Sequence, residues 1–118
     1  MWSVEIERSA KKELDALPSD LRIELLLAFE TLARNGPFEL PHGLARKIDG
    51  KLWELRVRVS SGIARAMYFT VHPQRAIVLT AFVKKSQKLP TREYEKAEAR
   101  MKSLQVSEAV ALKHQKER

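Results

Sequence analysis

The sequence predicts an α+β fold in which an N-terminal helical hairpin and a C-terminal helix pack on a small antiparallel sheet of four to five strands. Apolar residues recur at helical spacing across residues 10–36, alternate with a period of two across residues 45–85, and return to helical spacing after Pro90. The elements therefore follow the order strand, two helices, four strands in hairpin succession, and helix. We expect the helices to lie on one face of the sheet.

The N-terminal part predicts a short strand and two helices. Residues 2–6, WSVEI, alternate as a strand would, and Ser9 is placed to cap a helix that Pro18 ends. Ser19 caps a second helix, and Gly36 supplies its left-handed C-terminal end. The apolar residues of this second helix share one face and predict its core contacts: Leu21, Leu25, Ala28 and Leu32, widened by Leu26 and Phe29.

A hairpin follows the helices. Residues 45–48 form a short strand, and Asp49-Gly50 is a strong signal for a turn into residues 51–59, KLWELRVRV. This second strand has one apolar and one charged face, because side chains alternate along a strand. Its apolar face carries Trp53, Leu55, Val57 and Val59, and its charged face carries Glu54, Arg56 and Arg58.

Two more strands and a helix complete the domain. Residues 63–72 and 75–85 read as strands, and the second of these is apolar on both faces, as expected for a strand inside the sheet. Thr91 after Pro90 caps the last helix. We expect one domain over residues 1–104, followed by a polar tail or helix extension over residues 105–118.

Composition narrows the class of protein. The chain has 118 residues and a net charge of +7, and it contains no cysteine, which excludes disulfides and thiol nucleophiles. The N-terminus shows no apolar signal segment and no stretch is long enough to span a bilayer, so we expect a cytoplasmic protein that does not enter the membrane.

The charge is unevenly distributed. Residues 1–45 carry 5 basic and 8 acidic side chains, residues 46–88 carry 10 and 2, and residues 89–118 carry 7 and 5. The positive charge is therefore concentrated in the middle strands, which indicates a nucleic acid or another acidic partner.

Several kinds of active site are disfavoured. His42, His72 and His114 have no partners at metal-ligand spacing, so we expect no metal and no cofactor. No glycine-rich phosphate loop follows a strand, and no Ser-His-Asp arrangement can be traced. A set of cations on neighbouring strands remains as the candidate site: Lys47, Lys51, Arg56, Arg58, Arg65, Lys84, Lys85 and Lys88.

Arg65 is the most informative of these cations, because it lies among core-like residues in IARAMYF and a buried arginine needs a partner. It either forms an ion pair with Glu54 on the adjacent strand or belongs to a functional site. A two-residue turn at Ser61-Gly62 gives ladder partners whose numbers add to 123, which places Arg65 opposite Arg58 and on the face of Arg56. A three-residue loop from Ser60 to Gly62 gives ladder partners whose numbers add to 122 and moves Arg65 to the Trp53 face.

The cations have two alternative roles. Regular alternation allows only one of Lys84 and Lys85 to share the side of Arg56. A lysine among arginines has a lowered pKa and is able to move protons near neutrality. Such a group, together with arginines that stabilise a pentavalent phosphorus, suits metal-free RNA cleavage. The same cations also suit simple binding of a phosphate backbone.

Three segments of the chain are distinctive: KLWELRVRVSSGIARAMYF, VLTAFVKKSQKLP and, in the helix that follows, YEKAEAR. Together they resemble the RelE/ParE superfamily of toxin-antitoxin toxins, and most of all its HigB-like, phage-associated branch. The resemblance covers residues 2–104. It implies a RelE-like fold and a ribosome-dependent mRNA endonuclease that needs no metal. It also implies a cognate helix-turn-helix antitoxin as partner, and both a homodimer and a heterotetramer with the antitoxin stay open as the assembly.

The resemblance also implies roles for individual residues. Arg56 corresponds to a basic residue on the active strand, Arg65 to the arginine that meets the scissile phosphate, and Lys84 or Lys85 to the basic residue that closes the last strand. Glu54 stands where the best-known RelE enzymes have a lysine, and it would act as the base or orient Arg56. Tyr94 is the candidate for their aromatic residue near the C-terminal helix. The expected catalytic residues are Glu54, Arg56, Arg65, Lys84 and Lys85, with Lys47, Lys51, Arg58 and Lys88 binding RNA or the ribosome.

Two other functions fit the same sequence. The ParE side of the superfamily inhibits DNA gyrase by binding alone, and a phage-derived protein of this fold could bind RNA without cutting it.

Overall fold

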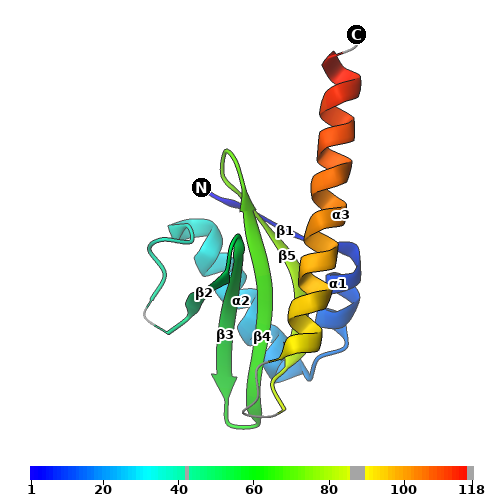
Figure 1. Ribbon diagram of the computed structural model, residues 1–118. Helices are drawn as coiled ribbons and strands as arrows, with labels where there is room; N and C mark the ends of the chain where they lie inside the picture. The colour runs from blue at the N-terminus through cyan, green and yellow to red at the C-terminus, as the bar shows by residue number, and fades with distance from the viewer. Residues whose placement is uncertain (42, 86–89, 117–118) are drawn as a thin grey trace.

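The computed structural model describes residues 1–41, 43–85 and 90–116, with side chains up to residue 107. Five strands form one sheet in the order β1-β5-β4-β3-β2 (Figure 1). The strands β2 to β5 are antiparallel neighbours as predicted, whereas β1 pairs parallel with β5. Their bounds are β1 Ser3–Ile6, β2 Ala45–Asp49, β3 Leu52–Val59, β4 Gly62–Val71 and β5 Arg75–Val83.

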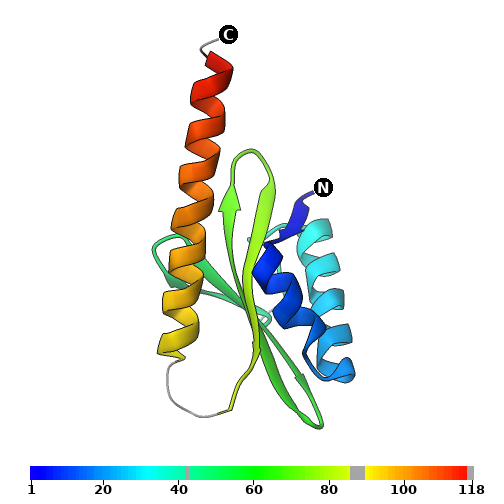
Figure 2. The ribbon, with the colours of Figure 1, turned by 90° about the vertical axis from the view of Figure 1, so that its right-hand side faces the viewer.

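The helices lie on both faces of the sheet, which corrects the expectation of a single face. The α1 helix (Arg8–Asp15) and the α2 helix (Ser19–Asn35) cover one face, and the α3 helix (Thr91–Lys116) crosses the other (Figures 1 and 2). The α3 helix continues past the sheet into the segment predicted as a polar tail or helix extension (Figure 2). Within the part of the chain that the structure describes, no helix is both long and apolar enough to cross a membrane.

Each face of the sheet has its own hydrophobic core beneath the helices that cover it. The core under α1 and α2 includes Leu25, Leu32, Leu55 and Tyr68. The core under α3 is smaller and includes Leu52, Met67, Phe69, Ile77, Leu79 and Ala97. The predicted apolar face of β3 packs into the first core, so the opposite face of β3, with its charged residues, lies on the α3 side of the sheet.

The helix ends differ in detail from the predicted caps. Glu7, rather than Ser9, caps α1, because its carboxylate accepts the N–H groups of Ser9 (2.9 Å) and Ala10 (3.2 Å). The α2 helix begins at Ser19 after Pro18, without a side-chain cap. Gly36 ends α2 with a φ of 77°, and a Cβ built there would lie 2.8 Å from Nε1 of Trp2. The positive φ and the close indole together require glycine at this position.

The α3 helix is hydrogen-bonded to the sheet at a β-bulge in β5. Tyr68 pairs with Val78 and Met67 pairs with Thr80, so Leu79 has no ladder partner in β4. The Leu79 carbonyl instead accepts a 2.8 Å hydrogen bond from Nη1 of Arg100 on α3. The bulge therefore provides an attachment point for α3.

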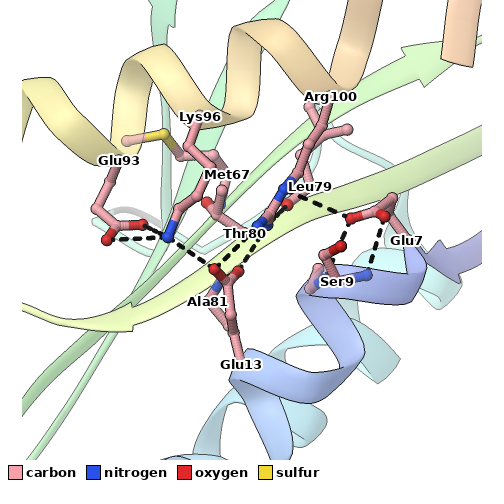
Figure 3. A network of polar contacts seen from close by, with 11 residues as sticks. Glu7, Ser9, Glu13, Met67, Leu79, Thr80, Ala81, Glu93, Lys96 and Arg100 are labelled. Carbon is pink, nitrogen blue, oxygen red and sulfur yellow. Dashed lines mark hydrogen bonds and ion pairs between the residues drawn. The ribbon is translucent and has the colours of Figure 1, made fainter. Parts of the chain in front are cut away.

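A network of charges reinforces this attachment (Figure 3). Glu13 of α1 accepts hydrogen bonds from Nζ of Lys96 (2.7 Å) and Nη1 of Arg100 (2.8 Å), both on α3. Burial raises the pKa of the Glu13 carboxyl, but the hydrogen bonds from Arg100 and Lys96 and the charges of these two residues outweigh it and leave the pKa below its usual value. These contacts hold α3 against α1 and β5.

Candidate functional site

Arg56 and Arg65 stand directly opposite each other in the β3–β4 ladder. Ladder partners there have numbers that add to 121, because Ser60-Ser61 forms the two-residue turn. Of the two arrangements that the sequence left open, the structure has the one with a two-residue turn, and its odd sum keeps Arg65 on the side of Arg56. The predicted ladder partner of Arg65 is wrong, because the turn lies one residue earlier than expected and Arg58 pairs with Ile63 instead.

Arg65 is buried and bound to Glu54. The Arg65 side chain is 5% exposed and that of Glu54 is 1% exposed, and Nη1 of Arg65 lies 3.2 Å from Oε2 of Glu54. The buried Nε of Arg65 has no hydrogen-bond partner within the described residues. The ion pair and the functional role are therefore compatible, because the pair leaves one donor of a buried guanidinium unused.

A further cation, Arg46, joins this group from the edge strand β2. Its Nε lies 3.3 Å from Oε1 of Glu54, its ladder partner. Sequence reasoning missed Arg46 because a turn at Asp49-Gly50 would pair Lys47 with Leu52 on the charged face. The turn is instead Gly50-Lys51, followed by a register shift between Lys47 and Asp49, which places Arg46 on that face. The one sequence signal that could have indicated it is Glu54 itself, because a single carboxylate has two oxygens and can accept from two cations.

Lys84 continues the β5 ladder beside Arg65. Its N–H donates to the carbonyl of Ile63 (2.9 Å), and alternation from Phe82, the partner of Arg65, places Lys84 on the same face. Desolvation, followed by the positive charges of Arg65 and Arg56, lowers the pKa of Lys84. Alternation places Lys85 on the other side, where it is exposed. Of the two predicted lysines, Lys84 is the one that the fold brings to the arginines.

Three of the other predicted residues lie elsewhere. Lys47 pairs with Trp53, on the opposite face of the sheet. Lys51 lies in the turn before β3, five residues or roughly 17 Å of strand from Arg56. Tyr94 donates its hydroxyl proton to Asp49 (2.8 Å), a hydrogen bond that raises the pKa of Tyr94 to about 12. Lys88 lies outside the described residues.

The assembled site is cationic and open to solvent on one side. Arg56 and Arg58 are exposed, and Lys84 is half-buried. Beside it lies a hollow of about 470 Å³ whose lining includes Phe82, Lys84 and Arg92. Across the described part of the chain, no group of three His, Cys, Asp or Glu side chains could hold a metal ion. These residues can bind a phosphate group through charge-assisted hydrogen bonds.

Comparison with known proteins identifies the family. Residues 12–102 match the family described as "Phage derived protein Gp49-like (DUF891)". The solved structure of a double mutant of the Escherichia coli toxin RelE in its free state is similar, with a TM-score of 0.59 and 18% sequence identity, and the match covers 84% of this chain and 96% of that one. No curated protein matches. The chain therefore belongs to the phage-derived Gp49-like family and has the fold of RelE, as the resemblance in its sequence predicted.

Proposed function

We propose that the protein is the toxin of a type II toxin-antitoxin pair and a ribosome-dependent mRNA endonuclease. The observation that carries the proposal is the pair of opposed arginines, Arg56 and Arg65, with an unused buried donor on Arg65 and with Lys84 beside them. Family membership and the RelE fold support a toxin of the RelE type.

The opposed arginines favour an anion between them. Ladder partners have Cβ atoms about 5 Å apart, and like charges so placed are destabilising. Glu54 neutralises part of the charge of Arg65, whereas Arg56 projects into solvent. Four cations, Arg46, Arg56, Arg65 and Lys84, surround this single carboxylate, a net charge of +3. A phosphate bound between Arg56 and Arg65 would relieve the repulsion and use the free Nε of Arg65.

The chemistry that suits these groups is attack by the ribose 2′-hydroxyl on the adjacent phosphorus. The new bond joins O2′ to phosphorus, and the bond from phosphorus to O5′ breaks, which gives a 2′,3′-cyclic phosphate and a 5′-hydroxyl. Arg56 and Arg65 stabilise the extra negative charge on the phosphorane oxygens. Lys84, with its lowered pKa, is the group suited to accept the proton of O2′ as a neutral amine and to return a proton to the leaving O5′. Arg58, two residues beyond Arg56 on the same face, and Lys85, exposed on the other side of the chain, would bind the RNA backbone or the ribosome.

Glu54 is better suited to orienting the arginines than to acting as the base. Its two carboxylate oxygens face one arginine each, Oε1 toward Arg46 and Oε2 toward Arg65, and the side chain is 1% exposed. Both oxygens are therefore engaged by arginine N–H groups, and the buried carboxylate fixes the positions of the two guanidinium groups. Lys47 and Lys51 lie away from the cluster, so any contact they make with RNA or the ribosome would be outside the reacting centre.

Primer extension on cellular mRNA after induction tests the proposal. Induction of the wild-type protein is expected to arrest growth and to create new 5′ ends within translated mRNA, and co-expression of the neighbouring antitoxin gene is expected to relieve the arrest. Arg65→Ala is expected to abolish the new ends. Lys12→Ala, an exposed substitution on α1, serves as the control that keeps them.

The alternatives give other results. Growth arrest without new 5′ ends, unaffected by Arg65→Ala, would indicate an inhibitor that acts by binding alone, as ParE toxins do on gyrase. RNA binding without new ends and without arrest would indicate a binding protein that does not cut.

A further inference from the structure

Arg46 is well placed to bind a ligand beyond Glu54. Its side chain is 61% exposed, and its Nε is held by Oε1 of Glu54 at 3.3 Å. Its two Nη groups make no hydrogen bond within the described part of the chain. Because the ion pair fixes the guanidinium through Nε, the opposite edge of the group is oriented toward solvent with its donors free.

The backbone forms a shallow hollow next to Arg46. The hollow measures about 120 Å³ and is lined by Gly43, Leu44, Ala45, Arg46, Glu54 and Arg56. The N–H of Arg56 donates to the Leu44 carbonyl at 2.8 Å, which fixes the lining segment against β3. A water molecule occupies about 30 Å³ in the liquid, so the hollow has room for a group several times larger, such as a phosphate.

Glu54 divides the cationic face into two anion positions. Its two oxygens bind Arg65 on one side and Arg46 on the other, so its negative charge lies between the two guanidinium groups. An anion placed between them would be repelled by the carboxylate, whereas an anion on either outer side would not. Arg56 belongs to both sides, because it faces Arg65 across the ladder and also lines the hollow beside Arg46.

The cationic face is wider than a single phosphate. Neighbouring strands lie about 4.8 Å apart, so the path from β5, beside Lys84, across β4 and β3 to β2 at Arg46 spans roughly 14 Å. One phosphate cannot contact side chains along this whole path. The positive charge of Arg46 also contributes to lowering the pKa of Lys84, which places both residues in one electrostatic field.

We propose that Arg46, together with Arg56, binds the phosphate next to the one held by Arg65, so that a single-stranded RNA crosses the strands from β5 toward the β2 edge. This inference rests on the proposed function, because it assumes that the cationic face binds RNA. It adds to that function a second phosphate contact and the path of the RNA across the sheet.

The salt dependence of binding to a non-cleavable oligonucleotide tests the inference. A fluorescent single-stranded RNA with 2′-O-methyl groups at every position is titrated with the full-length protein between 50 and 200 mM salt. Each phosphate contact to a single strand contributes about −0.7 to the slope of log K against log salt. Arg46→Ala is expected to make the slope shallower by about 0.7, so the loss of affinity over this range becomes about 2.6-fold smaller. Arg34→Ala on α2 removes the same charge from the opposite face and is expected to keep the wild-type slope.

Two further variants separate phosphate binding from a structural role. Arg46→Lys keeps the charge and is expected to keep the slope, whereas Arg46→Gln keeps a donor for Glu54 and is expected to lose as much slope as Arg46→Ala. A wild-type slope for Arg46→Gln, or an equal drop for Arg34→Ala, would overturn the inference while RNA binding itself stood. Absence of any binding by the wild-type protein would instead contradict the proposed function and with it the inference.

Discussion

Arg56 and Arg65 face each other across the β3–β4 ladder, one exposed and one 5% exposed with its charge shared by Glu54. Two guanidinium groups in this relationship do not stabilise each other. Their placement is explained when both bind the same ligand.

The Glu54–Arg65 pair is expected to be needed for stability when one member is removed alone. Arg65→Ala leaves a buried carboxylate with Arg46 as its remaining charged partner, so the free energy of unfolding should fall by about 3 kcal/mol. The double substitution Glu54→Leu with Arg65→Met replaces both charges by apolar groups of similar size and should recover most of that loss. Urea denaturation of the three proteins measures the difference.

The same double variant is expected to be inactive in RNA cleavage. Stability and cleavage are therefore separable: a stable double variant that still cut RNA would show that Arg65 serves the fold alone.

Lys84 is expected to determine the alkaline dependence of cleavage. Because its pKa is lowered, a rate that requires the neutral amine should rise with pH and level off below the pKa of an ordinary lysine. Lys84→Arg keeps the charge but cannot lose its proton, so the rise should disappear and the rate at neutral pH should fall roughly 10²-fold. Lys12→Arg on α1 is the matched control, and an unchanged pH profile in Lys84→Arg would exclude Lys84 as the proton-transfer group.

Acid should weaken the attachment of α3. The pKa of Glu13 is lower in the folded protein than its ordinary value of 4.5, so the stabilisation is complete above that value and is lost as pH falls through the folded pKa. Urea denaturation at pH 7 and pH 3 is expected to show a smaller pH effect for Glu13→Gln than for the wild type. Glu24→Gln on α2 is the control, and an equal decrease in both variants would contradict the prediction.

Gly36 is expected to be more sensitive to substitution than Gly50. Both have positive φ, 77° at Gly36 and 50° at Gly50. A Cβ at Gly36 would lie 2.8 Å from the Trp2 indole, whereas a Cβ at Gly50 would meet no neighbouring atom within 4 Å. Gly50→Ala should cost about 1 kcal/mol from backbone strain alone, and Gly36→Ala should cost more because the indole must move. Thermal denaturation compares the two, and equal losses would show that the Trp2 contact is unimportant.

Local patterns were sufficient to predict much of this protein. The type and order of every element follow from hydrophobic periodicity, since a helix or strand of this length is specified by its own residues. The face of Arg56 followed from alternation along β3, and the concentration of positive charge on the middle strands followed from counting.

Other features depended on long-range geometry. The parallel pairing of β1 with β5 and the position of α3 opposite α1 and α2 depend on which apolar surfaces meet after the chain has folded.

The site itself was decided by register. Turns displaced by one residue paired Arg65 with Arg56 rather than Arg58 and placed Arg46 beside Glu54. The β5 bulge set the face on which Lys84 emerges. A cationic strand surface could be predicted from the residues alone, because charge and alternation are local properties. Which cations share that surface depends on the register between distant strands, because a shift of one residue moves a side chain to the other face.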